Sequence, residues 1–439
     1  DIIGPFWELN IILICINIIL ATSLNLINGY TGQFSIGHAG FMAVGAYTSA
    51  IMTVKLGFPF EVGLIVATLS AGLLGLLIGL PTLRLDGDCP AKCAPSYVED
   101  ALIERAKHGI FGYSESQEDY FHAIAGWMHR RHHWDVEPDW LIKTPGVVFA
   151  LAMAVKAFTE AGDCVLIQQP VYYPFSEVIQ DNGRVVVSND LYLGTDNRYH
   201  MDLEDFEQKI VEHQIKLFLL CNPHNPSGRV FTREELTGMG EICLKHGVTV
   251  VCDEIHNDFV FQGEHTVFAS IKKEYADISV TCTSPSKTFN LASMLISNIF
   301  IPNEKLRQRF QHEVNAAGIS QLSVLGLVAT QAAYEHGDEW YEKMMAYVKS
   351  NIDYARNYVE EYLPGVKVIN GEGTYLVWLD FRGTGIETEE LDRRIIYDAK
   401  LWLDSGKIFG KTGEGFQRIN VAAPRKTIEE CFERIRKIL

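Results

Sequence analysis

Reactive side chains of this 439-residue chain gather at the ends of short apolar runs. The runs KLFLLCNP (216–223), VTVVCDEI (248–255) and ISVTCTSPSKTFN (278–290) all end in polar residues, among them the carboxylate of Asp253 and the amine of Lys287. A lysine amine that follows apolar sequence can act as a nucleophile toward a carbonyl group. A buried carboxylate favours the charged form of a neighbouring nitrogen. The pattern makes these residues candidates for an active site.

Strands that alternate with helices must position these residues. The run PGVVFALAMAVKAFTEAGDCVLI (145–167) predicts a turn, an amphipathic helix, a Gly-containing stop and a buried strand. Continuous Val/Ile/Leu strands separated by helices imply a largely parallel sheet covered on both faces. Ligands bind at the carboxyl ends of such strands, where the polar clusters fall. A helical stretch at 323–360, strand signals at 374–381 and 416–424 and a closing helix predict a second, smaller α/β domain.

Eight motifs occur along this part of the chain in a fixed order. They are GIFGY (109–113), PGVV (145–148), PVYYPF (170–175), CNPHNPSGRV (221–230), DEIHNDF (253–259), SPSKTFN (284–290), GTYLVWLDF (373–381) and GFQRINVAAPR (415–425). Together they resemble the class I/II aminotransferase superfamily, and within it the cystathionine β-lyase branch (the MalY/PatB type). The resemblance implies the fold-type I architecture of enzymes that use pyridoxal 5'-phosphate (PLP), and it implies a homodimer.

The resemblance also implies roles for single residues around the cofactor. Lys287 would hold PLP as a Schiff base and later move the substrate Cα proton. Asp253 would keep the pyridine nitrogen protonated. Asn225 would hydrogen-bond the ring hydroxyl oxygen, and Tyr172 would stack on the ring face. Lys287, Tyr172 and Asp253 are therefore the predicted catalytic residues.

A phosphate site is implied at the N-terminus of the helix that follows PGVV. Gly146 and Val147 would offer backbone N–H groups to the phosphate, and Ser284 and Ser286 would add hydroxyl donors. Tyr113 would reach the phosphate of a partner subunit.

Other residues are assigned to the substrate. By the same resemblance, Arg418 would clamp the α-carboxylate, with Asn225 and Tyr375 beside it. His256, a further predicted cofactor contact, stands where many aminotransferases have a tyrosine. The stretch LASMLISN (291–298) lacks the phosphate-binding arginine of those enzymes. Both departures favour the lyase branch.

The first 88 residues differ in character from the rest. No Asp, Glu, Lys or Arg occurs at 10–54 or at 62–83, and the stretches 10–26, 35–54 and 62–83 are long enough to predict three membrane-spanning helices. The residues NLINGYTGQFSIGHAGFMAVGAYTSA (25–50) and LPTLRLDGD (80–88) resemble permease subunits of branched-chain amino-acid ABC transporters. We interpret the chain as fragments of two unrelated genes joined together, with a membrane-tethered enzyme as the alternative.

The predicted organisation is a permease-like membrane segment (1–88), a PLP-binding large domain (89–320) and a small C-terminal domain (321–439). The PLP-binding part is expected in the cytoplasm and associates with the membrane if the first segment is genuine. An excess of 55 Asp+Glu over 38 Lys+Arg argues against a nucleic-acid partner.

No metal site is predicted. The nine cysteines form no CxxC pair, and small buried side chains are the expected role of those in strand-like runs. The motif HRRHHW (129–134) could bind metal or phosphate, but a solvated helix end is the preferred interpretation.

Three functions remain open. The first is a PLP-dependent carbon–sulfur β-lyase that releases a thiol, pyruvate and ammonia from cystathionine or another cysteine S-conjugate. The second is an aminotransferase that uses the same residues. The third is a transport component, which would need further spanning helices. A regulatory binding role of the lyase-like domain is left open as well.

Overall fold

A computed structural model describes residues 93–439, together with residues 48, 51–59, 62, 65, 66, 68 and 70. The chain divides into two compact units, Asp1–Gly87 and Asp88–Leu439. The described part of the first unit includes a five-residue π-helix, η2 (Ile51–Lys55). Most of each predicted membrane span lies outside the described residues. Within the residues that are described, every helix is too short or too polar to cross a bilayer, so the predicted spans gain no support there.

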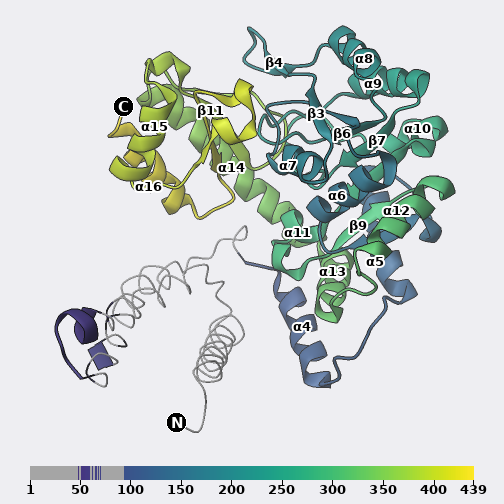
Figure 1. The fold of residues 1–439 in the computed structure, drawn as a ribbon, viewed down its shortest axis with the longest axis horizontal. Helices are drawn as coiled ribbons and strands as arrows, with labels where there is room; N and C mark the ends of the chain where they lie inside the picture. The colour runs from purple at the N-terminus through teal and green to yellow at the C-terminus, as the bar shows by residue number, and fades with distance from the viewer. Residues whose placement is uncertain are drawn as a thin grey trace. The chain divides into compact units, whose positions relative to one another are not determined.

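A seven-stranded sheet forms the centre of the second unit (Figure 1). Its strands are β1 (Leu141–Thr144), β2 (Cys164–Ile167), β3 (Val185–Ser188), β6 (Leu217–Cys221), β7 (Thr249–Asp253), β8 (Ser279–Thr283) and β9 (Ser297–Phe300). They lie in the order β1-β9-β8-β7-β6-β2-β3. The neighbouring strands β3, β2, β6, β7 and β8 pair in parallel. Strand β9 pairs antiparallel with both β8 and β1. The prediction of a largely parallel sheet is confirmed.

Helices bury both faces of this sheet, as the continuous apolar strands require. The helices of this part are α4 (Ser96–His108), α5 (Glu118–His132), α6 (Val147–Phe158), α7 (Pro174–Asp181), α8 (Leu203–Glu212), α9 (Arg233–His246), α10 (Lys273–Asp277), α11 (Pro285–Thr288), α12 (Glu304–Ala316) and α13 (Val324–His336). Along β6, Leu217 and Leu219 pack in one core with α6, α7 and α12. Phe218 and Leu220 pack in the other core with α8, α9 and α10.

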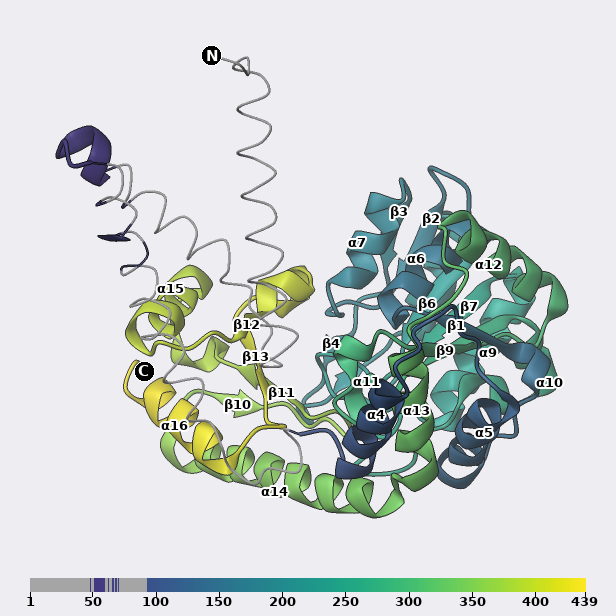
Figure 2. The same ribbon diagram turned by 90° about the horizontal axis from the view of Figure 1, so that it is seen from below.

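A second, smaller sheet lies near the C-terminus. Its strands β10 (Lys367–Val368), β11 (Leu376–Asp380), β13 (Phe416–Asn420) and β12 (Asp404–Ser405) are antiparallel, in that order. Helices α15 (Thr388–Arg393) and α16 (Arg425–Arg436) pack with it in a separate core. The long helix α14 (Asp338–Tyr362) runs from the large-sheet helices to this small domain (Figure 2).

The remaining elements are short. They are the hairpin strands β4 (Tyr192–Leu193) and β5 (Tyr199–His200), the 3-10 helices η3 (Pro138–Trp140), η4 (Phe268–Ser270), η5 (Ala292–Met294), η6 (Arg382–Thr384), η8 (Gly406–Phe409) and η9 (Lys411–Gly413), and the π-helix η7 (Arg394–Asp398).

The predicted boundary at residues 320/321 stays a proposal. Helix α13, which follows it, packs with α4 and α5 beside the large sheet, where Leu327 and Tyr334 share a core with Val98 and Trp127. Along α14, Met344 and Val348 share a cluster with Phe259, whereas Ala355 and Val359 belong to the core around the small sheet.

Helix α9, which leads into β7 and Asp253, begins with a capping box. The Thr232 hydroxyl accepts from the Glu235 N–H at 3.2 Å, and the Glu235 carboxylate accepts from the Thr232 N–H at 2.7 Å. These two bonds satisfy donors that the first helical turn would otherwise leave unpaired.

We expect Thr232→Ala to lower the free energy of unfolding by about 1 kcal/mol, because it removes one of the two capping bonds. Urea denaturation followed by circular dichroism measures the change. Thr237→Ala in the same helix is the control, since its hydroxyl donates only to the Arg233 carbonyl at 2.7 Å. Equal stability loss in both variants would contradict the capping role.

Candidate active site

Three neighbouring strands of the large sheet end side by side. Cys221 of β6 pairs with Asp253 of β7, and Asp253 pairs with Cys282 of β8. The segments that follow carry Asn225 and His256 in loops and Lys287 in α11. They converge because the strands are parallel and their carboxyl ends share one edge. The predicted convergence of the three polar clusters is confirmed.

A cavity of about 350 Å³ opens at this edge between the large sheet and the small domain. Nine predicted site residues line it: Gly146, Val147, Tyr172, Asn225, Asp253, His256, Lys287, Tyr375 and Arg418. They come from β7 and β13, from the N-terminal end of α6, from α11, and from the loops before α7, after β6, after β7 and before β11. Both domains therefore build the cavity.

Burial changes the acidity of the two charged groups at its floor. The side chain of Asp253 is removed from water, which raises the pKa of its carboxyl to about 7; the Ile255 N–H, 3.1 Å from Oδ1, and the charge of Lys287 oppose that rise. Burial also lowers the pKa of the Lys287 amine, and Asp253 partly offsets the effect. A lysine with a lowered pKa carries more of the neutral, nucleophilic amine.

A short set of hydrogen bonds connects the walls. The Arg418 guanidinium donates from Nη1 to Asn225 Oδ1 at 2.7 Å, and the Tyr172 N–H donates to the Asn225 carbonyl at 2.9 Å. Burial raises the pKa of the Tyr172 hydroxyl to about 12, so that phenol stays protonated near neutral pH. The predicted substrate arginine, ring-facing tyrosine and amide therefore form one connected group.

Helix α6 points its N-terminus at the cavity. Gly146 precedes it with φ 134°, a conformation that L side chains rarely adopt, and no side chain caps the helix. The first N–H groups of α6 are consequently open to an anion. Gly146 and Val147 both line the cavity there.

An aromatic wall closes the side next to the small domain. The Tyr375 ring lies 5.5 Å from the His256 ring and 4.7 Å from the Phe259 ring. Burial lowers the pKa of His256 to about 3, and the charges of Lys287 and Arg418 add to that effect. His256 is thus neutral, and its buried Nδ1 has no hydrogen-bond partner among the described residues.

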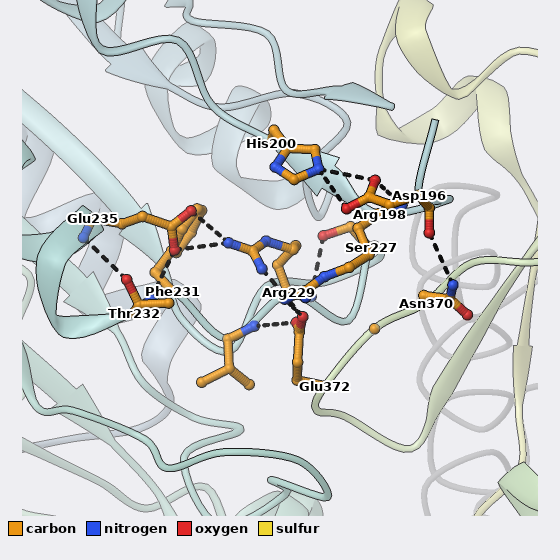
Figure 3. A network of polar contacts seen from close by, with 12 residues as sticks. Asp196, Arg198, His200, Ser227, Arg229, Phe231, Thr232, Glu235, Asn370 and Glu372 are labelled. Carbon is orange, nitrogen blue, oxygen red and sulfur yellow. Dashed lines mark hydrogen bonds and ion pairs between the residues drawn. The ribbon is translucent and has the colours of Figure 1, made fainter. Parts of the chain in front are cut away.

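Ion pairs connect the loop after β6, which carries Arg229, with the segment before β11, which carries Glu372 (Figure 3). Glu372 accepts from Arg229 Nη1 at 3.2 Å and from the Val230 N–H at 3.1 Å, and it also pairs with Arg198. Arg229, which is nearly fully buried, donates from Nη2 to both carboxylate oxygens of Glu235 at 2.6 and 2.7 Å. Buried charges in this position are paired on both sides, as their desolvation requires.

Three predicted site residues do not line the cavity. The Ser284 hydroxyl caps α11, accepting from the Ser286 N–H at 3.1 Å, and donates to the Ile296 carbonyl at 2.8 Å. Ser286 lines an adjoining hollow together with Lys287 and Tyr375. Tyr113 is 96% exposed on the segment between α4 and α5. Their roles toward a phosphate stay predictions.

The expectation of a solvated helix end at 129–134 is wrong in part. His129 is exposed, but His132 and Trp134 are buried. His132 bonds Asp258 at 2.9 Å, and that same carboxylate accepts from the Thr288 hydroxyl at 2.5 Å. The helical repeat turns every third or fourth residue inward, which a motif of consecutive polar letters conceals. No group of three or more potential metal ligands occurs in the described part of the chain.

Sequence reasoning missed Asp404, which lines the cavity beside Arg418. It belongs to the two-residue strand β12, whose only signal is its register opposite β13. A strand that short has no alternating pattern to reveal it.

Comparisons with known proteins identify the family. The model of aminotransferase class I and II matches residues 86–435. The chain belongs to this family. The recognised family and the fold-type I architecture are thereby confirmed.

Individual relatives include a named cystathionine beta-lyase and two solved structures that contain PLP. Cystathionine beta-lyase PatB of Bacillus subtilis (strain 168) is 43% identical over 368 residues, which cover 84% of this chain and 94% of that protein. A PLP-bound putative aminotransferase from Clostridium difficile 630 is 40% identical, with a TM-score of 0.77 over 79% of this chain and 89% of the other. Cystalysin from Treponema denticola, whose structure contains pyridoxal 5'-phosphate, is 37% identical, with a TM-score of 0.77 over 79% of this chain and 88% of the cystalysin chain.

A second family model matches the first part of the chain. The branched-chain amino acid transport system / permease component covers residues 9–91, in agreement with the recognised resemblance.

Because the pKa of Asp253 is raised, its carboxyl should make stability depend on pH. Below pH about 4 this carboxyl is protonated in both the folded and the unfolded chain, so it does not reduce the free energy of unfolding. Between pH about 4 and 7 the unfolded chain ionises while the folded one does not, so stability falls as pH rises. Above pH 7 the carboxyl is ionised in both states, and the free energy of unfolding falls no further on its account.

We therefore expect Asp253→Asn, in protein prepared without PLP, to raise the free energy of unfolding by about 2–4 kcal/mol at pH 8 and by much less at pH 4.5. Urea denaturation at the two pH values measures this. Asp181→Asn, at an exposed position at the end of α7, is the control. A gain that is the same at both pH values would show that ionisation of Asp253 is not its cause.

Proposed function

We propose that this chain is a PLP-dependent carbon–sulfur β-lyase that acts on cystathionine or a related cysteine S-conjugate. The observation that carries the proposal is one cavity that holds a partly buried lysine of lowered pKa, a buried aspartate and an arginine. The similarity to PatB, a cystathionine beta-lyase, supports the reaction type. The similarity to PLP-containing structures supports the cofactor.

The cavity fits PLP on its own chemistry. The free N–H groups of α6 suit a phosphate, the Tyr172 ring suits an aromatic face, and the carboxylate of Asp253 suits a pyridinium nitrogen. Its volume of about 350 Å³ lies in the range of small-molecule sites. Gly146, Val147, Tyr172, Asn225, Asp253, His256 and Lys287 would hold the cofactor, with Ser284 and Ser286 near its phosphate.

When bound, PLP supplies an aldehyde that condenses with amines and a ring that accepts the electron pair of a carbanion. Lys287 offers its neutral Nζ as the attachment point and then as the base that takes the substrate Cα proton. Asp253 holds a proton at the ring nitrogen, where its buried carboxylate interacts strongly with positive charge. Arg418, oriented by Asn225, binds the substrate α-carboxylate with Tyr375 at its side.

The same residues also suit an aminotransferase, so the fate of the amino group must be tested. With cystathionine, a lyase releases thiol and pyruvate in the absence of any added 2-oxo acid. We expect the purified full chain loaded with PLP to do so, in an assay that couples pyruvate to lactate dehydrogenase and detects thiol separately. Product formation only after a 2-oxo acid is added would favour the aminotransferase and overturn the lyase.

We further propose a homodimer, with Tyr113 contributing to the partner subunit's site. Tyr113 is exposed together with Phe111 and Ile110 on one segment, and those apolar side chains are what an interface would bury. Cross-linking or light scattering of the full chain tests the assembly.

Replacement of Lys287 tests the covalent role. We expect Lys287→Ala to abolish PLP that borohydride fixes to the protein and to lower pyruvate release at least about 10³-fold, because both nucleophile and base are lost. Mass spectrometry after borohydride treatment and the coupled assay measure the two effects.

Lys216→Ala is the matched control, because Lys216 precedes β6 at the opposite end and pairs with Asp163 at 2.9 Å. Fixed cofactor that persists in Lys287→Ala would contradict the assignment.

A further inference from the structure

Asp404 occupies a position in the cavity wall that the proposed reaction does not use. In the small sheet it stands opposite Arg418, on the neighbouring strand. Its Oδ2 accepts from Arg418 Nη2 at 2.5 Å and from Nε at 3.1 Å. The Asp404 side chain is 40% exposed whereas that of Arg418 is 12% exposed, so the carboxylate lies on the open side of the pair.

The contacts of Arg418 leave a defined set of donors. A guanidinium has five N–H groups. Asp404 engages one on Nε and one on Nη2, Asn225 engages one on Nη1, and the ring of Phe409 lies 4.8 Å from the guanidinium carbon. One N–H remains on each terminal nitrogen, which suffices for a single two-oxygen contact with one carboxylate.

The charges in the cavity wall are few. Lys287 and Arg418 are its cationic side chains and Asp253 and Asp404 its anionic ones. Lys287 serves the amine chemistry, and Arg418 already shares its charge with Asp404. A substrate α-carboxylate would accept from the two N–H groups of Arg418 that remain unpaired. A second carboxylate on the same ligand would meet the charge of Asp404 instead.

That repulsion reaches the whole cavity. In a space of about 350 Å³ any ligand charge lies within the roughly 10 Å over which charges interact in 0.1 M salt. Like charges in a partly desolvated site disfavour each other more than they do in water.

We propose that Asp404 determines substrate specificity: it selects amino acids with one carboxylate, or with a balanced second charge, over dicarboxylic amino acids. The proposal rests on the proposed function in one respect, that the α-carboxylate binds Arg418. Cystathionine fits the selected class, since the acid at its far end is accompanied by an ammonium group. L-glutamate, whose side chain carries an uncompensated carboxylate, does not fit it.

The wild-type protein provides a first test without any substitution. L-glutamine and L-glutamate have nearly the same shape and differ by one negative charge. We expect the full chain loaded with PLP to bind L-glutamine about tenfold more tightly than L-glutamate, a difference of about 1.4 kcal/mol, in isothermal titration calorimetry. Equal affinity, or tighter binding of L-glutamate, would overturn the proposal.

Two variants then locate the effect. Asp404→Asn keeps the shape and an oxygen acceptor for Arg418 but removes the charge, so affinity for L-glutamate should rise about tenfold while that for L-glutamine changes little. Asp404→Ser removes the charge together with most of the side chain, and should also lower the preference for L-glutamine. Asp398→Asn is the matched control, because Asp398 is similarly exposed and pairs with Arg393 at 3.0 Å outside the cavity.

An unchanged ratio of the two affinities in both Asp404 variants would overturn the proposal. If the ratio is unchanged because both affinities fall equally, Asp404 only holds Arg418 in place. Neither ligand carries a β-leaving group, so binding is measured separately from thiol release. Absence of thiol release from cystathionine, with the preference for L-glutamine intact, would contradict the lyase and leave the role of Asp404 standing.

Discussion

The pair of the buried Asp253 and the partly buried Lys287 is the constraint on which the site depends. A carboxylate taken out of water loses much of its solvation, and the single N–H of Ile255 replaces little of it. The nearby lysine lowers that cost, and the same burial lowers the pKa of the lysine. Desolvation thus raises the pKa of Asp253 and lowers that of Lys287, and the charge of each group limits the shift of the other. Helices on both faces of the sheet make this burial possible, because they keep water from the strand ends.

A cavity at the edge of one sheet would still lack its substrate arginine, which the small domain supplies. Arg418 lies on β13, in the small sheet, and reaches Asn225 in a loop of the large sheet. That contact requires the two domains to hold a fixed position. The pairing of Arg229 with Glu235 and Glu372 behind the loop contributes to it, since Glu372 lies on the segment that leads into β11. Two glycines allow the close approach: an added Cβ at Gly371 would come within 2.7 Å of the Gly228 backbone.

The sequence predicted those parts of the site that follow from local pattern and sheet topology. Asp253 and Lys287 end apolar runs, and parallel strands bring such ends together whatever the intervening helices do. Tyr172 and Arg418 were found through resemblance to the family and then located in the same cavity. What local pattern does not encode was missed. The hydroxyl of Ser284 also caps a helix and bonds the Ile296 carbonyl, contacts that depend on a turn geometry. Asp404 enters the site through the register of a two-residue strand, and His132 through the inward turn of a helix end.

Among the described residues, the hydrophobic cores that surround the cavity are built from side chains of the aminotransferase-like part. The buried members of the core that contains α4, α5 and α13 begin at Val98, and those of the two sheet cores begin at Ile142 and Leu166. The small-domain core begins at Ala355. The burial that shifts Asp253 and Lys287 thus draws on side chains of the aminotransferase-like part itself.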